Sequence, residues 1–478
     1  MLEPWDEHNQ RLAAQVHPAD WSNPVPRGRY HLLVVGGGPA GLVAAAGAAG
    51  LGARVALVER HLLGGDCLNV GCVPSKALLA SAKAAAHARH AGKLGVHTGE
   101  VSVDFPAVMA RMRQLRADLS RHDSAGRFRD LGIDVFLGEG SFTGRDAFTI
   151  GGQTLRFARA CIATGARAAL HTVPGLGDTP LLTNETLFNL NALPQRLTII
   201  GAGPIGCEMA QAFARFGSAV TLLDAAPRIL PREAPEASAL VAQALEGDGV
   251  HIEYSVRNPR IEADAVLMAA GRVPNVEGLN LEAAGVNYTK KGVTVDDRLR
   301  TSNPHIFAAG DVASAYAFTH AADALARIVI RNALFLGRAK ASALTIPWCN
   351  YTDPECAHVG DTAEALKQRG ANFASHTLNM DALDRAILDG ETEGFVTVHA
   401  DPNGKILGAD AVGARAGDLI GEISLAMTHG ITLGQAASAI HPYPTYAEAF
   451  RKLGDVYNRT RLTPTTRSLL GLLLRRLG

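Results

Sequence analysis

The sequence predicts an α/β protein built around two similar, doubly wound parallel sheets. Its 478 residues are enough for about three domains of ordinary size. Hydrophobic residues make up 47% of the chain and charged residues 19%, which indicates a well-buried globular core. A Gly-rich segment of strand and helix character occurs twice along the chain, and this repeat carries most of the expectation.

The composition excludes several classes of protein. The chain has 46 basic and 46 acidic residues, so it lacks the basic excess of a protein that coats nucleic acid. Six cysteines are too few for a disulfide scaffold, and the polar start MLEPWDEHNQ has no secretory signal, so we expect a reduced, cytoplasmic protein. The uncharged stretch 32–53 is long enough to span a membrane, but its seven glycines and one proline predict a strand, a turn and a helix, with no transmembrane segment.

The repeat aligns residues 32–59 with residues 197–224 at a constant offset of 165 and without a gap. Each copy predicts an apolar strand, a G-x-G-x-x-G turn, a helix of small residues and a second strand that ends in an acid. The matched positions are Gly36, Gly38, Gly41 and Glu59 in the first copy, and Gly201, Gly203, Gly206 and Asp224 in the second.

These residue types suit a Rossmann-like dinucleotide site. The first glycine makes a tight turn, the second lets the backbone approach a pyrophosphate, and the third lets the helix pack on the strand. The helix N-terminus offers N–H groups to the phosphates, and the acid accepts hydrogen bonds from a ribose hydroxyl. The sequence therefore predicts two dinucleotide sites. Asp224 would repel a 2′-phosphate and favours NADH, whereas Arg228 nearby keeps NADPH open.

Three further segments have the pattern of the strands that close such units. They span 158–167, 263–275 and 301–313, and each leads into a turn that contains glycine. In the third segment the glycine is followed by Asp311. This residue is either a ligand group at the carboxyl edge of a parallel sheet or the N-cap of a following helix.

Cys67 and Cys72 lie five residues apart at the start of an Ala-rich helix that we expect to run to about His90. In an ideal helix such residues have Cα atoms about 8.6 Å apart, whereas a disulfide tolerates at most about 7 Å. The two can therefore join only if the first helical turn is distorted, and the surrounding glycines leave room for this. A local bridge is easily cycled and a helix N-terminus stabilises a thiolate, so the pair predicts a redox centre.

The two Gly motifs, the run C-L-N-V-G-C-V-P-S-K, A-T-G at 163–165 and A-A-G-D at 308–311 together resemble the flavoprotein pyridine nucleotide–disulfide oxidoreductases over about residues 31–460. The resemblance implies FAD in the first site, NAD(P)H in the second, and a C-terminal α+β dimerisation domain that shares the active site of a homodimer. It implies that hydride passes from nicotinamide to flavin and that electrons then reach the disulfide. Cys72 would hold the charge-transfer thiolate and Cys67 would exchange with substrate.

The resemblance also assigns further site residues and the domain limits. Lys76 would lie beside the flavin and Glu208 would be its carboxylate partner. The further cofactor-binding residues that it implies are Gly65, Lys76, Thr164, Gly165, Gly271, Asp311 and Thr319. The implied parts of the chain are an N-terminal extension (1–30), an FAD-binding domain (31–165 and 274–343), an NAD(P)-binding domain (166–273), a dimerisation domain (344–464) and a basic, apolar tail (465–478).

The segment HPYPTYAEAF at 441–450 bears on the substrate. Disulfide reductases of the family carry H-P-x-x-x-E, whose histidine and glutamate form a base. Placing Glu448 on this motif puts Tyr443 in the histidine position, which resembles the mercuric reductases, and a phenol with a pKa of about 10 is a poor base at neutral pH. The rival alignment needs a two-residue insertion and keeps His441 as the base. The register of the loop favours Tyr443.

Other features depart from the mercuric reductases, because the chain lacks both a vicinal cysteine pair in its tail and an N-terminal Cys-x-x-Cys domain. Soft Hg(II) needs thiolates, so Cys67 and Cys72 are the candidate transient ligands and no structural metal site is predicted. We expect Cys349 and Cys356 to be buried and apolar. We expect residues 1–30 to form an extended arm, and the tail to form a docked helix in preference to a helix on a membrane surface or a partner.

Three functions are compatible with these patterns. The first is an FAD enzyme that uses NAD(P)H to reduce a metal ion, a disulfide or a quinone-like acceptor through Cys67 and Cys72. The second is a dihydrolipoamide dehydrogenase, which needs His441 in the base position. The third is a flavin-bearing redox sensor whose disulfide changes state without turnover. The presence of all the electron-relay groups favours the first.

Overall fold

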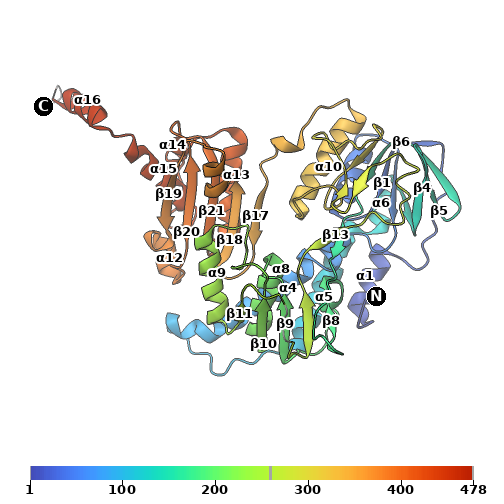
Figure 1. The fold of residues 1–478 in the computed structure, drawn as a ribbon, viewed down its shortest axis with the longest axis horizontal. Helices are drawn as coiled ribbons and strands as arrows, with labels where there is room; N and C mark the ends of the chain where they lie inside the picture. The colour runs from blue at the N-terminus through green and yellow to red at the C-terminus, as the bar shows by residue number, and fades with distance from the viewer. Residues whose placement is uncertain (1, 258–260, 476–478) are drawn as a thin grey trace.

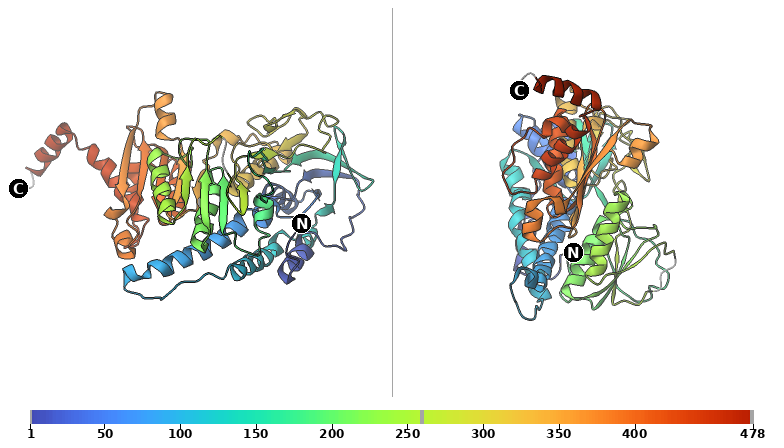
Figure 2. Two further views of the ribbon diagram at one scale, coloured as in Figure 1. Left: turned by 60° about the horizontal axis from the view of Figure 1, so that its bottom comes forward. Right: turned by 90° about the vertical axis from the view of Figure 1, so that its left-hand side faces the viewer.

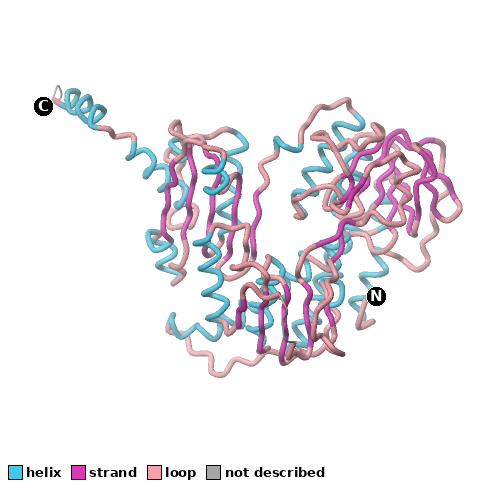
Figure 3. Tube along the Cα trace, in the orientation of Figure 1, coloured by secondary structure: helices cyan, strands magenta, loops and turns pink. Residues whose placement is uncertain are grey.

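The computed structural model describes residues 2–257 and 261–475. Its strands form three main sheets, which Figure 1 shows on the right, at the bottom and on the left of the molecule in chain order. Figure 3 shows the strands of each sheet grouped together with helices around them. The predictions for Met1, for 258–260 and for the last three residues of the tail lie outside the described residues.

The first sheet forms around the N-terminal copy of the repeat, as predicted. Strands β3, β2, β1, β6 and β16 run parallel in this spatial order, and β5 and β4 continue the sheet as antiparallel strands beside the first half of β6. The strands are β1 (Arg29–Val35), β2 (Val55–Glu59), β3 (Asp134–Leu137), β4 (Gly140–Gly144), β5 (Ala147–Ile150), β6 (Gln153–Ile162) and β16 (Ile306–Ala308). The helices are α2 (Pro39–Gly50), α3 (Gly65–Asn69), α4 (Cys72–His90), α5 (Phe105–Leu119), α6 (Ala125–Asp130) and α10 (Thr319–Leu334), with 3-10 turns at Ala91–Leu94 and Ser120–Asp123.

The second sheet forms around the second copy, and its five strands are all parallel in the order β11-β10-β9-β12-β8. The strands are β8 (Leu181–Leu182), β9 (Arg196–Ile200), β10 (Ala219–Leu223), β11 (His251–Glu253) and β12 (Ala265–Met268), and the helices are α7 (Asn184–Leu187), α8 (Pro204–Phe216) and α9 (Pro235–Gly247). All three predicted closing strands are therefore present: β6 lies beside β1, β12 beside β9, and β16 beside β6.

The third sheet is antiparallel in the order β17-β18-β21-β20-β19, and α13 packs on it. Two short antiparallel pairs lie outside the main sheets, and one of them, β7 with β13, joins the first two domains. The remaining strands are β7 (Ala166–Ala168), β13 (Arg272–Pro274), β14 (Tyr288–Thr289), β15 (Gly292–Val293), β17 (Pro347–Asn350), β18 (Glu355–Gly360), β19 (Ala374–Asn379), β20 (Phe395–Ala400) and β21 (Ile406–Gly413). The remaining helices are α11 (Ala363–Gln368), α12 (Asp384–Asp389), α13 (Ala416–His429), α14 (Leu433–Ala436) and α15 (Glu448–Thr460), with 3-10 turns at Ala341–Ala343 and Met380–Ala382.

Helix α4 of the first domain packs on α8 of the second. Three buried aromatic rings, those of Phe105, Phe213 and Phe216, gather beside this contact with centroids 5.8–6.1 Å apart. Burying an aromatic side chain of this size stabilises by about 1.5–3 kcal/mol. The contact therefore connects the two predicted nucleotide domains through an apolar core and not only through the chain crossovers.

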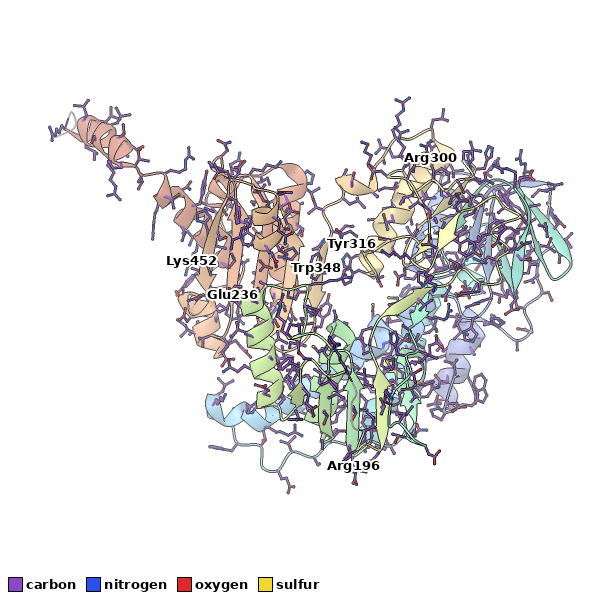
Figure 4. All side chains as sticks on the ribbon, viewed as in Figure 1. Arg196, Glu236, Arg300, Tyr316, Trp348 and Lys452 are labelled. Carbon is purple, nitrogen blue, oxygen red and sulfur yellow. The ribbon has the colours of Figure 1, made fainter. Side chains whose placement is uncertain are left out.

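The third domain is held to the second by buried polar groups. Glu233 precedes α9, and its Oε1 accepts hydrogen bonds from Trp348 Nε1 (2.8 Å) and Asn350 Nδ2 (3.0 Å) on β17. Figure 4 labels Trp348 on β17 and Glu236 at the start of α9. The Trp348 ring also packs on His358, with ring centroids 4.4 Å apart. These contacts position β17, whose continuation reaches the redox site.

The N-terminal segment is not the extended arm that we expected. Residues 7–16 form helix α1 (Glu7–Val16), whose N-cap Asp6 also accepts a hydrogen bond from Arg113 Nε (2.5 Å). Fully buried Arg116 of α5 donates to Asn9 Oδ1 (2.6 Å). The segment is therefore part of the first domain, because its polar groups and its apolar face complete the packing around α5.

The C-terminal tail is not docked on the chain, which corrects our expectation for it. Helix α16 (Pro464–Leu474) has no buried residue. Both Figure 1 and Figure 2 show it extending away from the third domain. Among the described residues no helix is long and apolar enough to cross a membrane.

Candidate active site

The redox segment has the interrupted helix that the sequence predicts. Helix α3 carries Cys67 and ends at Asn69, and α4 begins at Cys72 and runs to His90. The break lies between them, where Val70 leaves helical geometry with φ −143°. A Cβ on Gly71 would lie 2.8 Å from the carbonyl oxygen of Asp66, so the chain turns back on itself more tightly than a residue with a side chain allows.

Both cysteines are free thiols in this structure. Hydrogen bonding between the two thiols raises the pKa of Cys67 and lowers the pKa of Cys72. Thr319, the first residue of α10, lies with its Oγ1 3.4 Å from Cys72 Sγ and lowers the pKa of Cys72 further, as does the charge of Lys76. In the dithiol form the proton therefore remains on Cys67 and the thiolate is Cys72.

Lys76 and Glu208 form the ion pair that the resemblance implies. Lys76 Nζ donates to both carboxylate oxygens of Glu208, at 3.0 and 2.8 Å, and so joins α4 to α8. Glu208 is almost fully buried, and its Oε1 also accepts a hydrogen bond from the backbone N–H of Tyr351 (3.0 Å). The Tyr351 ring lies 4.6 Å from Lys76 Nζ, within cation–π range. All three domains therefore meet at this pair.

The two Gly-rich turns have the same geometry. Gly36 and Gly201 have φ of +110° and +106°, which favours glycine at each position. A Cβ on Gly41 would lie 1.8 Å from the carbonyl oxygen of Gly36, and a Cβ on Gly206 would lie 1.8 Å from that of Gly201. In both copies the third glycine is therefore required for the helix to begin against the turn.

The two acids at the ends of the second strands also match. Glu59 accepts hydrogen bonds from the backbone N–H of Gly37 (2.6 Å) and of the residue two beyond itself (2.7 Å). Asp224 accepts them from Ala202 (2.5 Å) and from the residue two beyond itself (2.7 Å). Each carboxylate is thus held at the mouth of its turn with lone pairs left for a ribose hydroxyl.

The residues present fit the two dinucleotides. A Cβ on Gly203 would meet nothing within 4 Å, and one on Gly38 would meet only Gly65 Cα, at 3.7 Å, so the backbone over the second glycine leaves a cradle for a pyrophosphate. At the edge of the first site the guanidinium of Arg272 contacts Asp66, and its Nε lies 3.5 Å from Asp311 Oδ2. That buried Nε has no hydrogen-bond partner among the described residues.

Asp311 follows β16 in a turn and is not a helix N-cap, so that alternative is wrong: the next helix, α10, starts at Thr319 and has Phe318 as its cap. Thr164 and Gly165 follow β6 and are tied to Asn275, which donates to the Thr164 carbonyl (2.9 Å) and to the Gly165 carbonyl (2.9 Å). These bonds join the two chain segments that connect the first and second domains. Gly271 lies beside them with φ +90°.

The C-terminal motif is brought together only in part. His441 Nε2 lies 2.8 Å from Glu422 Oε1 on α13, and its side chain is nearly buried. Tyr443 donates to Asp384 Oδ2 (2.8 Å) and is 70% exposed. Glu448 is buried, and its Oε2 has no hydrogen-bond partner in the described chain. Within one chain, therefore, the His441–Glu448 base pair does not form.

Two site residues escaped the sequence analysis. Tyr351 directly follows β17, and its contact with Lys76 joins residues 275 positions apart. Arg272 lies in one of the closing segments, and its two acidic partners come from α3 and from the turn after β16. Both could be suspected only from their neighbours in sequence, because pairing at this separation leaves no local pattern.

Cys356 is buried as expected, whereas Cys349 is only half-buried. Burial raises the pKa of the Cys349 and Cys356 thiols. The strand register pairs Cys349 with Ala357 and Asn350 with Cys356, which directs the two thiols to opposite faces of the sheet. The described residues contain no cluster of three or more His, Cys, Asp or Glu side chains that could hold a metal ion.

Two nucleotide cradles, with a thiol pair one turn from a lysine that pairs with a buried carboxylate, define a dinucleotide-dependent redox protein. The chain belongs to the pyridine nucleotide–disulphide oxidoreductases, whose family model matches residues 30–326, and the model of their dimerisation domain matches residues 346–453. The family is FAD-dependent and uses a pyridine nucleotide.

Its relatives include enzymes of two activities. The chain is 35% identical to a mercuric reductase of Streptomyces lividans over 90% of this chain and 96% of that protein. It is 33% identical to a dihydrolipoyl dehydrogenase of Geobacillus stearothermophilus over 89% and 95%. Among solved structures, it is similar to the HOCl-induced flavoprotein disulfide reductase RclA of Escherichia coli (28% identity, TM-score 0.80, 89% and 99% covered) and to LpdA of Mycobacterium tuberculosis (27%, 0.81, 89% and 99%).

A first prediction contrasts two glycines of the second turn. Gly206→Ala places a methyl 1.8 Å from a backbone oxygen, so we expect α8 to shift and the protein to lose about 3 kcal/mol of stability, seen as a lower Tm. Gly203→Ala meets no protein atom within 4 Å, so its Tm stays at that of the wild type while the KM for the pyridine nucleotide rises about tenfold. Equal Tm values for the two variants would contradict the close approach of Gly206 to the carbonyl oxygen of Gly201.

A second prediction concerns the Cys72 thiolate. Thr319→Val removes a hydroxyl that stabilises the thiolate, so the pKa of Cys72 rises and the thiolate of the two-electron-reduced enzyme is lost at a higher pH as the solution is acidified. The long-wavelength thiolate–flavin absorbance, recorded against pH, measures this. Thr319→Ser keeps the hydroxyl and serves as the matched control. Cys67→Ala, which removes the larger contribution, shifts the titration further; no shift in Thr319→Val would refute the contact.

Proposed function

We propose that the protein transfers two electrons from NAD(P)H, through FAD, to an acceptor that reacts at the Cys67/Cys72 pair. The observation that carries this is the thiol pair itself: Cys72 is the thiolate, and the Lys76–Glu208 ion pair lies one helical turn beyond it. Glycine cradles of the two nucleotide domains flank the same region. The relatives, which are mercuric reductases and dihydrolipoyl dehydrogenases, support the same type of chemistry.

The proposed reaction balances for two kinds of acceptor. For a disulfide, NAD(P)H, one proton and R–S–S–R give NAD(P)⁺ and two R–SH, and the Cys67–Cys72 disulfide forms and is reduced again in each cycle. For a mercuric ion, NAD(P)H and Hg²⁺ give NAD(P)⁺, a proton and Hg⁰, with Cys67 and Cys72 as transient thiolate ligands. In the first case the sulfur pair itself carries the two electrons, whereas in the second it binds the ion that accepts them.

The chain's own residues divide this work. Cys67, which holds the proton and lies five residues before Cys72, exchanges with the acceptor. The Cys72 thiolate is stabilised by Thr319 and Lys76. Lys76, held by Glu208, places a positive charge beside the isoalloxazine site. Bound FAD would supply the electron relay between nicotinamide and sulfur.

We assign the first cradle to FAD and the second to the nicotinamide dinucleotide. Gly36, Gly38, Gly41 and Glu59 hold the adenosine and pyrophosphate of FAD, and Asp311 and Arg272 lie at the same edge. The further FAD contacts that we propose are Gly65, Lys76, Thr164, Gly165 and Thr319. The proposed NAD(P)H contacts are Gly201, Gly203, Gly206, Asp224 and Gly271.

NADH is the proposed reductant. Asp224 lies at the mouth of the second cradle, where a 2′-phosphate would meet its negative charge. The guanidinium of Arg228, which could have offset that charge, donates instead to the carbonyls of Glu233 (2.7 Å) and Pro231 (2.9 Å). This arrangement supports NADH over NADPH.

We propose that the acceptor site lies between two subunits of a homodimer. We also propose that the domains have the limits that the sequence predicts. Tyr443 is 70% exposed, and Ile440, three residues before it, is 98% exposed. Both lie just before α15, within the residues that match the dimerisation domain. We propose Tyr443 and Glu448 as the groups that line the acceptor site, by analogy with the mercuric reductases. His441, which pairs with Glu422, is a supporting residue in this proposal.

The decisive test is an anaerobic titration of the purified flavoprotein with NADH and, separately, NADPH. We expect a long-wavelength band after two electrons, and NADH to be the better reductant. Cys72→Ser abolishes the band, whereas Cys67→Ser leaves Cys72 unpaired and shows the band before any reductant is added. Flavin bleaching without a band would overturn the relay. Reduction with a band but turnover of no acceptor would identify a redox sensor.

A second test separates the candidate acceptors. Tyr443→Phe removes the hydroxyl but keeps the ring, and we expect it to slow NADH-dependent Hg(II) reduction about tenfold while flavin reduction by NADH is unchanged. His441→Gln stays within about twofold of the wild type with Hg(II). If His441→Gln abolished dihydrolipoamide oxidation and Tyr443→Phe had no effect on either reaction, the protein would be a dihydrolipoamide dehydrogenase.

A further inference from the structure

Helix α16 presents its leucines to solvent. The helix has eleven residues, none of them buried. Its five leucines have large exposed fractions: Leu469 59%, Leu470 43%, Leu472 54%, Leu473 51% and Leu474 66%. Exposed apolar side chains that are neighbours in space, unlike scattered ones, mark a surface that binds something.

The leucines share one side of the helix. At about 100° per residue, all five fall within an arc of about 200°. Arg467, Ser468, Gly471 and Arg475 lie on the opposite side, and two threonines of the first turn complete the apolar arc. A helix that packs on its own protein commonly needs a stripe of about 100°. An arc twice as wide suits a helix that is immersed to about half its circumference.

The charge of this segment has one sign. After Asp455 the sequence contains five arginines and no acidic residue. Arg467 and Arg475 form no ion pair with any residue that the structure describes, so both remain available to an external anion. A helix with leucines on one side and arginines on the other is complementary to an anionic surface that also has an apolar layer.

The helix has its own N-terminal cap and buries no residue against the rest of the described chain. Its N-cap Thr463 accepts a hydrogen bond from the Thr466 N–H (3.2 Å), and Pro464 stands at the first helical position. Residues 461–463 separate it from α15. Figure 1 shows it beyond the third domain, at the end opposite the first domain. It can therefore reach a flat surface that the domains themselves do not touch.

We propose that α16 binds the surface of an anionic lipid bilayer, lying in its plane with the five leucines among the acyl chains and Arg467 and Arg475 at the headgroups. The protein would then carry out its redox reaction at a membrane surface. This proposal does not depend on the electron acceptor or on any step of the proposed function. A second copy of the chain is the alternative occupant, and it is disfavoured because the leucine arc is wider than a helix–helix contact covers.

The test is sedimentation of the full-length, FAD-loaded protein with vesicles. Vesicles of phosphatidylglycerol and phosphatidylcholine should bind it, and vesicles of phosphatidylcholine alone should bind it at least tenfold more weakly. Leu469→Gln/Leu473→Gln should lower binding to the anionic vesicles at least tenfold. The matched control Ser468→Gln/Gly471→Gln makes the same change on the polar side, where a Cβ at Gly471 meets nothing within 4 Å, and should bind as the wild type does.

Arg467→Gln/Arg475→Gln should also weaken binding to anionic vesicles, and its residual binding should depend less on salt. All variants should keep the native molecular mass in light scattering and the wild-type rate of flavin reduction by NADH. Equal sedimentation of the leucine variant and its control would overturn the proposal. A lower molecular mass in the leucine variant alone would overturn it too, by showing that the leucines pack on a second copy.

Discussion

The ion pair between Lys76 and Glu208 is the interaction on which the rest of the site depends. Glu208 is buried on α8, where an unpaired carboxylate would cost about 3–5 kcal/mol. The ammonium and the backbone N–H that donate its three hydrogen bonds therefore have to stay in place. Two of the bonds come from Lys76 on α4 and the third from Tyr351, which directly follows β17, so one carboxylate holds segments of three domains. Because Cys72 lies one turn before Lys76 on the same helix, this contact also positions the thiolate.

The nucleotide domains could be predicted from sequence because their decisive contacts are local. The third glycine of each turn approaches the carbonyl of the first, five residues earlier, and the acid binds the turn at the end of the adjacent strand. Because both turns have the same geometry, the same residue types recur at the same spacing in the two copies. The break between α3 and α4 was predictable for the same reason, because residues five apart in an unbroken helix are too distant to form a disulfide.

What could not be predicted depends on contacts between distant segments. Helix α1 is held by Arg116 of α5, more than a hundred positions away, so its sequence alone resembled an arm. His441 pairs with Glu422, which no reading of the motif around it could reveal. Tyr351 is identified as a site residue only by its contact in the fold, where its backbone N–H donates to Glu208 on α8. For α16 the difficulty is different: an amphipathic pattern predicts that a surface will cover the helix but not whether that surface belongs to the chain.

The short separation of Cys67 and Cys72 has a consequence for the thermodynamics of the fold. A bridge between them closes a loop of only six residues, for which the chain-entropy contribution is about 2 kcal/mol, less than half of that for a loop of about 100 residues. The folded architecture is therefore only weakly coupled to the oxidation state of the pair, and the chain can be oxidised and reduced repeatedly without approaching its unfolding transition. The hydroxyl and the ammonium that lower the pKa of Cys72 stabilise its thiolate, and a more stable thiolate favours the dithiol over the bridge.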